Sequence, residues 1–246
     1  MTILTALLLA TMVPEPTAVD PIPATAESQV ASPALQLSRI VHSETNVIGD
    51  ADDDRRAVEM MQELFDSDPD MADMERDYPG IVQQFAEAML PIINESSRER
   101  LPDLQARHAA LYAETFTDAE LAVLIAFYSS ATGRKLISHA LDSMNFEATM
   151  AEMKQSGDFQ YSAESTVKDS HAAAAKAIGA MNAEDQAVLA ELGRSGLLPK
   201  LQAMALQTHQ ITIDWNDEYA SGEEVALDEV LEAILDKRME SSDEQD

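Results

Sequence analysis

Hydrophobic residues recur along this chain with the three-to-four-residue spacing of an amphipathic α-helix, and not with the alternation of a β-strand. From residue 54 to residue 239 these stripes follow one another with few interruptions. The strand-like run from Ile211 to Ile213 lies inside a longer helical stripe. The whole chain has only eight glycines, and few of the turn pairs that hairpins need. The pattern predicts an all-α bundle of about seven to eight amphipathic helices, in a single domain over residues 54–239.

Prolines and serines indicate where several of these helices begin and end. Pro79 suits the first turn of a helix, where its missing N–H is harmless. The same helix must kink or stop near Pro91, because a proline inside a helix removes a hydrogen bond and clashes with the preceding turn. We expect Ser97 to begin the next helix. Further helices are expected over residues 54–65, 162–181 and 223–239.

Residues 115–136 contain the best-defined helix boundary in the chain. Thr117 and Glu120 form the T-x-x-E pattern of a capping box, in which each side chain accepts the backbone N–H of the other residue. The helix that follows is apolar around most of its circumference, which is typical of a helix inside a bundle. Residues 129–132 then predict a tight corner, and Gly133 either ends one helix or lets the next approach closely. An anion site built from serine hydroxyls and free N–H groups at this corner is the alternative.

The same residues resemble a known family signature. Its pattern is an aromatic residue, F-T-x-x-E-L, an apolar run, F-Y-x-S, one or two small residues, a glycine and K-L, and the chain carries it from Tyr112 to Leu136. The positions that define this signature are Phe116, Thr117, Glu120, Phe127, Tyr128, Ser130 and Gly133. The segment is thereby similar to the bacterial family catalogued as domain of unknown function 2059. The resemblance implies a helical, usually exported bacterial protein, and it brings no catalytic residue because the family has no established activity.

A second segment aligns with the first without gaps. Residues 181–206 align with residues 116–141 at an offset of 65, and eight of the 26 positions are identical. The identical pairs are Ala122/Ala187, Val123/Val188, Leu124/Leu189, Ser130/Ser195, Lys135/Lys200, Leu136/Leu201, Ala140/Ala205 and Leu141/Leu206. We interpret the two segments as a degenerate duplicated helix–corner–helix hairpin. A chance match between two amphipathic helices is the alternative.

The duplication also predicts where a binding site is expected. Tyr128 aligns with Gly193, so side-chain volume is lost at one of two equivalent positions, and a cleft is expected beside Gly193. The predicted binding residues are Gly193, Ser195, Trp215 and Tyr219. We further expect equivalent corners at Ser130 and Ser195, and burial of Leu124, Leu189, Leu136 and Leu201.

The charge of the chain excludes two classes of partner. Lys and Arg number 16 against 45 Asp and Glu, which gives a formal net charge of −29. Such a surface repels phosphate backbones and anionic lipid headgroups, so we predict binding neither to nucleic acid nor to an anionic membrane surface. The sequence contains no cysteine, which excludes disulfides, thiol nucleophiles and cysteine-ligated metal sites.

The two ends of the sequence differ in composition from the helical part. The run from Ile3 to Val13 is uncharged, too short to span a bilayer and of the right length for the apolar part of a signal peptide, with an A-x-A cleavage pattern at residues 24–26. We therefore predict a signal peptide over residues 1–26 and export, to the periplasm of a Gram-negative bacterium; an uncleaved, unstructured end is the alternative. Residues 27–53 are interpreted as a disordered linker, and residues 240–246 as an acidic disordered tail.

No catalytic or cofactor motif emerges. Phosphate-binding loops, dinucleotide fingerprints and H-E-x-x-H are absent from the sequence. Residues 66–77 imitate a calcium loop but carry Met71 where the sharp turn needs glycine, so we interpret them as an acidic loop between helices. The M-x-x-M pairs Met71/Met74 and Met150/Met153 suit Cu(I), but methionine also fills irregular helical cores, and we favour that interpretation. We predict no cofactor and no metal.

These observations favour a non-enzymatic protein that binds a protein partner, an accessory module of the bacterial envelope. The alternative is a small-ligand binder, or a hydrolase without a recognisable motif, that uses a cleft between the two hairpins. A deep pocket with two or more convergent polar side chains favours the small ligand. A flat, exposed apolar patch favours the protein partner.

Overall fold

The structure, a computed structural model, describes residues 31–67, 69–156, 161–218 and 223–243. Within these ranges the regular secondary structure is helical and contains no strand, which confirms the all-α prediction. The helices are α1 (Pro33–Val41), α2 (Glu44–Ile48), α3 (Ala51–Ser67), α4 (Pro69–Asp77), α5 (Ile81–Thr115), α6 (Asp118–Ser129), α7 (Ala131–Asp142), α8 (Glu147–Ser156), α9 (Ala163–Ala180), α10 (Ala183–Arg194), α11 (Leu198–Ala203), α12 (Ala205–Asp217) and α13 (Glu223–Asp243). They outnumber the seven to eight expected, because helices as short as α2 and α11 give no periodic pattern. None of the described helices is both long enough and apolar enough to cross a membrane.

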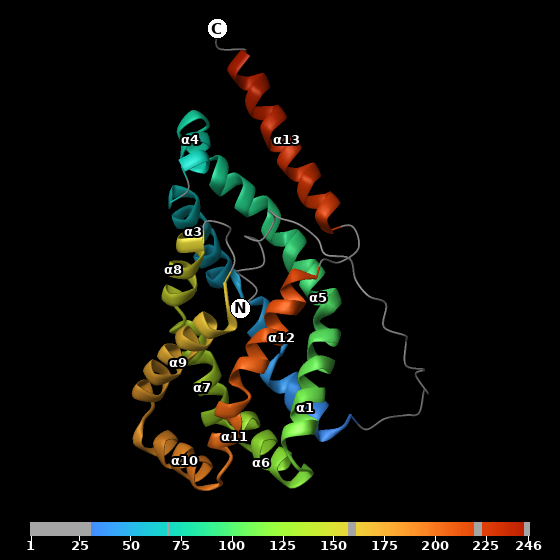
Figure 1. Cartoon of the computed structure of the whole chain (residues 1–246), viewed down its shortest axis with the longest axis vertical. Helices are drawn as coiled ribbons and strands as arrows, with labels where there is room; N and C mark the ends of the chain where they lie inside the picture. Colours follow the sequence, from blue (N-terminus) through green and yellow to red (C-terminus); the bar gives the residue numbers. More distant parts are fainter. Residues whose placement is uncertain (1–30, 68, 157–160, 219–222, 244–246) are drawn as a thin grey trace, which may run out of the picture.

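Helix α5 is the axis of the molecule. It runs through most of its length, and the other helices gather around its two halves (Figure 1). The helices α3, α4, α8 and α13 lie towards its N-terminal end, and α1, α6, α10 and α11 lie towards its C-terminal end. The helices α7, α9 and α12 occupy the region between these two groups, so this middle region brings together segments that are far apart in the sequence.

Helix α5 corrects the expectation of two helices separated near Pro91 and Ser97. It continues from Ile81 to Thr115 with both Pro91 and Pro102 inside it, and Figure 1 shows that it changes direction along its length. Each proline deprives a carbonyl of its donor and favours a bend. The helix continues because buried residues follow one another through both sites, and Ser97 is fully buried within it rather than at its start.

The structure also corrects the linker expected over residues 27–53. From Pro33 onwards this stretch forms α1, α2 and the beginning of α3. Ser32 accepts the N–H of Leu35 at 3.3 Å and Pro33 occupies the first turn, so α1 begins with an ordinary cap. Leu37 is only 2% exposed because α1 packs against α5 and α6. A helix of nine residues is too short for its apolar stripe alone to distinguish it from a linker.

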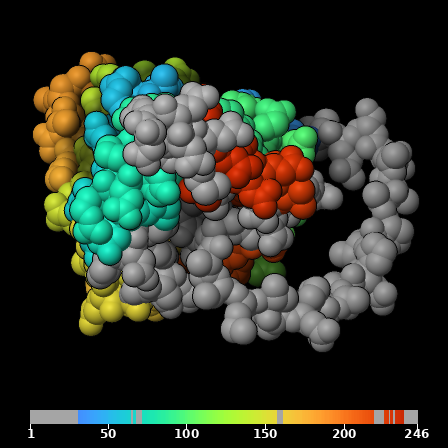
Figure 2. Space-filling model, turned by 90° about the horizontal axis from the view of Figure 1, so that it is seen from above, coloured from blue at the N-terminus to red at the C-terminus, as the bar shows by residue number. Residues whose placement is uncertain are grey.

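Two other segments expected to be irregular are helical. The acidic stretch 66–77, expected as a loop, forms the end of α3 and the whole of α4, apart from residue 68, which lies outside the described residues. Helix α13 continues to Asp243, so it includes the first four residues of the expected tail. Figure 2 looks onto this end of the molecule and shows α4 and α13 on the same face.

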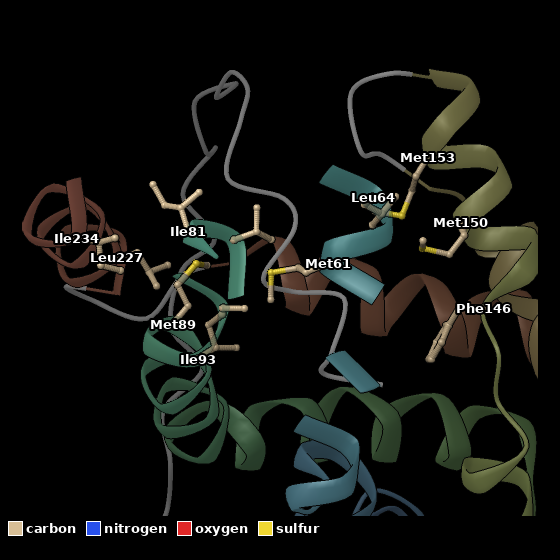
Figure 3. Packing of buried hydrophobic residues seen from close by; sticks show 12 residues of the cluster. Met61, Leu64, Ile81, Met89, Ile93, Phe146, Met150, Met153, Leu227 and Ile234 are labelled. Carbon is tan, nitrogen blue, oxygen red and sulfur yellow. The ribbon is translucent and has the colours of Figure 1, made fainter. Parts of the chain in front are cut away.

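A methionine-rich core fills the end formed by α3, α5, α8 and α13. Met61 and Met153 are fully buried, and Figure 3 shows Met150 and Met153 of α8 in the same cluster as Leu64 of α3. Unbranched, polarisable side chains adapt to the irregular gaps between crossing helices. These methionines therefore act as core residues, as the sequence interpretation favoured, while the side chain of Met71 lies outside the described part.

The opposite end has a core of its own. It lies between α1, the last turns of α5, α6 and the helices α10 to α12. Its larger buried residues are Leu37, Leu111, Tyr112, Phe116, Leu121, Leu124, Phe127, Leu192, Leu197 and Met204. A third, smaller cluster forms where α2, α5 and α12 meet, and its buried members are Val47, Ile48, Leu101, Leu104 and Trp215. This third cluster borders the candidate site.

Candidate functional site

A cavity of about 400 Å³ lies where α1, α2, α5, α6, α7, α9 and α12 meet. Its volume falls within the roughly 300–1,000 Å³ of small-molecule pockets. Its lining residues are Val41, His42, Asn46, Val47, Leu104, Tyr128, Leu136, Ile137, Ala140, Leu141, Met144, Ser170, Ala174, Ile178, His209, Thr212, Trp215 and Asn216. The cavity is therefore a product of the whole bundle and not of any single hairpin.

The lining is largely apolar and carries no formal charge. One wall consists of aliphatic side chains from α7 and α9, and among the described residues that line the cavity none is Asp, Glu, Lys or Arg. The polar lining residues are His42, Asn46, Tyr128, Ser170, His209, Thr212, Trp215 and Asn216. An ionic ligand group would lose its hydration here without gaining a partner, which is costly. The lining therefore favours a neutral and mostly apolar ligand body.

Two histidines stack at one side of the cavity. The rings of His42 and His108 have centroids 3.8 Å apart and planes within 12° of each other. His42 Nε2 lies 3.0 Å from the Tyr112 hydroxyl, and the Thr212 hydroxyl lies 3.4 Å from His108 Nε2. Burial lowers the pKa of His42 well below its usual value, with His108 and then His209 adding to the effect. Burial also lowers the pKa of His108 to about 4, so both imidazoles are neutral at neutral pH.

A third histidine presents an unpaired nitrogen. Nδ1 of His209 and Nδ1 of His108 are buried, and neither has a hydrogen-bond partner among the described residues. Burial lowers the pKa of His209 to about 4, so this ring is neutral too. A buried polar group without a partner costs about 1–3 kcal/mol. His209 also lines the cavity, so this buried nitrogen lies at its edge.

Trp215 forms the floor of the cavity next to α5. It is 1% exposed, and its indole N–H donates to the Arg100 carbonyl at 3.2 Å. The Arg100 guanidinium lies over the indole, 4.5 Å from the ring centroid, and donates to the Trp215 carbonyl at 2.6 Å. These contacts hold Trp215 in one orientation, and its ring is the only indole in the sequence. Of the four predicted binding residues, Trp215 is the one that the structure places in this cavity.

The corner between α6 and α7 places Tyr128 at the cavity. The capping box is confirmed: Thr117 N donates to Glu120 Oε2 at 2.9 Å, and Glu120 N donates to Thr117 Oγ1 at 3.4 Å. At the other end, Ser130 caps α7 by accepting the N–H of Gly133 at 3.0 Å. These two caps set the length of α6, and Tyr128 in its last turn lines the cavity. Burial raises the pKa of this phenol, which therefore stays neutral.

The remaining signature residues build the corner itself. Phe116 and Phe127 are buried in the second core, and Phe127 packs edge-on against Tyr128 with 5.0 Å between ring centroids. Ser130 Oγ donates to the Phe127 carbonyl at 2.6 Å while it accepts from Gly133, so the corner satisfies its own polar groups. A helix–helix corner, rather than an anion site, explains these residues.

The two aligned hairpins contact each other through reciprocal ion pairs. Lys200 Nζ lies 2.7 Å from Glu120 Oε1, and Lys135 Nζ lies 2.9 Å from Asp185 Oδ2. At the offset of 65, Glu120 corresponds to Asp185 and Lys135 to Lys200. Each acid therefore contacts the lysine of the other hairpin, which is the contact pattern of two copies related by a two-fold axis. This reciprocity supports the interpretation of the two segments as a duplication.

Their helix ends correspond as well. Thr117 and Asn182, which are 65 residues apart, are both N-caps that accept the N–H three residues on. The hydroxyls of Ser130 and Ser195 donate to the carbonyls of residues 127 and 192, each at 2.6 Å. The hairpins differ further along, because the second helix of the later one is interrupted at Met204, between α11 and α12.

The burial of the paired leucines agrees only in part. Leu124 is fully buried, whereas its counterpart Leu189 is half-buried. Leu136 and Leu201 are alike, but both are half-buried at the edge of the second core. The first helix of the earlier hairpin lies deeper in the bundle because α1 covers it, while α10 stays near the surface.

The cavity lies beside Tyr128 and not beside Gly193. Gly193 and Ser195 are exposed, and neither lines the cavity. A Cβ added at Gly193 would meet only Leu198 Cδ1, at 3.7 Å, so the missing side chain faces open space and leaves no void between helices. Tyr219 lies outside the described residues. The predicted site thus shares Trp215 with the cavity, while the cleft expected from the repeat lies elsewhere.

The predicted binding residues did not include the three histidines of the cavity region. His42 falls in the stretch interpreted as a linker, and His108 and His209 each lie on an apolar helical stripe. A histidine on such a stripe was the available signal, but it does not reveal which helices face one another. Among the described residues, no group of three or more His, Asp or Glu side chains is able to hold a metal ion.

Residues 102–157 match the model of the bacterial family described as "Uncharacterized protein conserved in bacteria (DUF2059)". This match confirms the family resemblance over that segment. It runs from the C-terminal half of α5 through α6 and α7 into α8, so it includes Tyr128 and the α7 wall of the cavity. No match was found among curated proteins or among solved structures.

Proposed function

We propose that this protein is a non-catalytic, exported bacterial protein that binds a small, mostly apolar molecule in the cavity beside Tyr128 and Trp215. The observation that carries the proposal is a cavity of about 400 Å³ whose described lining residues include several polar side chains but no charged one. Deep apolar pockets with a few convergent polar groups are typical of ligand sites. His209 adds a buried nitrogen that lacks a partner among the described residues.

The exposed apolar residues of the described part of the chain give less support to a protein partner. A partner-binding surface calls for a contiguous exposed apolar patch. The large apolar residues that the structure identifies as exposed lie one on each of five helices: Val123, Ile178, Leu198, Leu206 and Val225. One of them, Ile178, belongs to the lining of the cavity, and that cavity combines a mostly apolar lining with several polar side chains, which favours the small ligand.

Export and absence of catalysis complete the proposal. The uncharged run Ile3–Val13 and the A-x-A pattern support export, and the intact mass of the protein from its native cell tests it, because retention of Met1 would contradict cleavage. The three neutral histidines have no carboxylate among their recorded hydrogen-bond partners in the described residues. A catalytic imidazole base is usually oriented by such a group, so the geometry favours binding over hydrolysis.

The single tryptophan provides the assay. N-phenyl-1-naphthylamine is neutral and apolar, and it accepts excitation energy from a nearby indole; we therefore expect saturable energy transfer from Trp215 on titration. Ala174→Phe places a large ring in the cavity wall, whereas Ala175→Phe adds the same ring to the exposed side of α9. We expect Ala174→Phe to weaken binding at least tenfold and Ala175→Phe to leave it unchanged.

Two results would contradict this proposal. The first is the absence of saturable energy transfer in the folded wild-type protein. The second is equal binding by the Ala174→Phe and Ala175→Phe variants, because the probe would then occupy another surface. Circular dichroism shows whether each variant retains its helices.

A further inference from the structure

We infer that the ligand is an elongated amphiphile with a cationic head, whose apolar chain lies in the cavity and whose head lies in an acidic vestibule. This inference rests on the proposed function. The vestibule is a second cavity of about 330 Å³, and the charged residues of its lining are Asp53, Arg56, Glu59 and Glu63.

The two cavities adjoin each other. Asn46, Leu141 and Met144 line both of them, so these three side chains separate an uncharged chamber from a charged one. Met144 is an unbranched side chain and adapts readily to a chain passing beside it. A compact ligand would fill either cavity alone. Both cavities are partly open to solvent, so an elongated molecule that lies across these three residues reaches both and matches the change from an apolar to a polar lining.

The charges of the vestibule select the head group. Its lining contains three carboxylates, from Asp53, Glu59 and Glu63, and one cation, Arg56. Arg56 is already engaged, because its guanidinium forms an ion pair with Asp53. Asp142 lies close enough to Arg56 to raise its pKa, after the larger effect of Asp53.

The two glutamates leave the vestibule negative. Glu63 Oε1 accepts from Lys154 Nζ at 2.7 Å, across α3 and α8. Glu59 is exposed and makes no ion pair within the described part of the chain. A cationic head is attracted by Glu59, and also because the carboxylates of the lining outnumber its one cation. An anionic head meets repulsion from the same groups, because the one lining cation is already paired with Asp53.

Competition against bound N-phenyl-1-naphthylamine tests the head group. Dodecyltrimethylammonium, dodecyl sulfate and dodecanol share one chain length and differ in charge, and each is used below its micelle concentration. We expect the ammonium compound to displace the probe at about tenfold lower concentration than the sulfate at low salt, with dodecanol between them. The preference should shrink as salt is added, because the vestibule is open to solvent.

Matched charge variants show whether the preference for ammonium comes from the vestibule or from the net charge of the whole protein. The double variant Glu59→Gln/Glu63→Gln removes two charges from the vestibule, and Glu184→Gln/Glu191→Gln removes two from exposed positions on α10. We expect the first to abolish most of the preference for ammonium over sulfate and the second to retain it. Neither should alter the affinity for the neutral probe.

The outcomes distinguish this inference from the proposed function. Failure of the neutral probe to bind would overturn both. Normal probe binding with equal or better displacement by the sulfate would overturn the cationic head and leave the proposed function intact. If the two double variants lose the preference for ammonium equally, the preference comes from the overall charge of the protein, and the assignment to the vestibule is overturned.

Discussion

Substituting alanine at Gly133 and at Gly193 should change stability in opposite directions. Both glycines lie within helices, and neither has a positive φ, so a Cβ is conformationally allowed at each. They differ in what that Cβ would meet. At Gly133 it would lie 2.1 Å from the Phe127 carbonyl oxygen and 2.7 Å from Tyr128 Cα, whereas at Gly193 its nearest recorded contact is Leu198 Cδ1 at 3.7 Å.

The magnitudes follow from these distances. Alanine gains about 1 kcal/mol over glycine in a helix interior, so Gly193→Ala should stabilise the protein by roughly 0.5–1 kcal/mol. At Gly133 the obstructing atoms belong to the backbone and cannot rotate away, and overpacking of this kind costs about 1–3 kcal/mol. Opening the corner would also weaken the cap between the Gly133 N–H and Ser130, worth about 1 kcal/mol. The net expectation for Gly133→Ala is a loss of about 2 kcal/mol.

Urea unfolding monitored by circular dichroism and by Trp215 fluorescence measures both changes. For a chain of this size, the loss at Gly133 corresponds to roughly 4–8 °C in melting temperature. Gly133→Val should be worse still, because the larger side chain meets the same backbone. Equal effects at the two glycines, or stabilisation by Gly133→Ala, would refute the close approach of α6 and α7 as the reason for a glycine at this corner.

Three further predictions concern the caps, the ion pairs and the histidines. Thr117→Ala should destabilise the protein by about 1 kcal/mol in urea unfolding, because it removes the hydroxyl that accepts the Glu120 N–H; no loss would contradict the cap. Lys135→Met should destabilise the protein more than Lys200→Met. The first change removes the ion-pair partner of Asp185, whose side chain is 8% exposed, and the second removes that of Glu120, whose side chain is 27% exposed. The reverse order would contradict this reasoning. The pKa of His108 is lowered from 6.5 to about 4 in the folded protein. Between these two values the unfolded chain binds a proton that the folded protein does not bind. The free energy of unfolding should therefore fall by up to about 3 kcal/mol as the pH drops from 6.5 to 4. His108→Phe should reduce that slope, and the remaining slope should come from His42 and His209, whose pKa values burial also lowers. An unaltered slope in His108→Phe would refute the assignment.

The fold class was predictable because most helices carry a long apolar stripe, but their boundaries followed tertiary contacts. The capping box at Thr117 is a local arrangement, and the sequence alone identified it. The continuity of α5 through Pro91 and Pro102 is not local, because the surrounding helices supply the burial that outweighs two lost hydrogen bonds. The helix α1 escaped prediction for the same reason: its partners are α5 and α6, far along the chain.

Sequence analysis could predict residues of the candidate site only where a residue was conspicuous by its own type. Trp215 was among the predicted binding residues and lines the cavity, whereas Tyr128, which also lines it, was expected to fill its own hairpin and leave no cleft. The argument from the repeat correctly identified that Gly193 lacks the volume of Tyr128, but volume lost on an exposed face opens no cleft. The cavity depends instead on how α7, α9 and α12 meet, and sequence spacing does not specify that arrangement.

The wall of the cavity formed by α1 and α2 is held by apolar packing as well as by polar contacts. Leu37 of α1 and Val47 of α2 are buried in the apolar clusters that include α5. In addition, Ser38 Oγ donates to the Gln105 carbonyl at 2.8 Å, and Gln105 Nε2 donates to the His42 carbonyl at 2.8 Å. Single hydrogen bonds of this kind contribute about 1 kcal/mol each. The same wall supplies His42 and Asn46, which border the chamber and, in the case of Asn46, the vestibule as well. The part of the fold that sequence analysis took for a linker is therefore a built wall of the candidate site, and it offers a polar side chain to a ligand in either cavity.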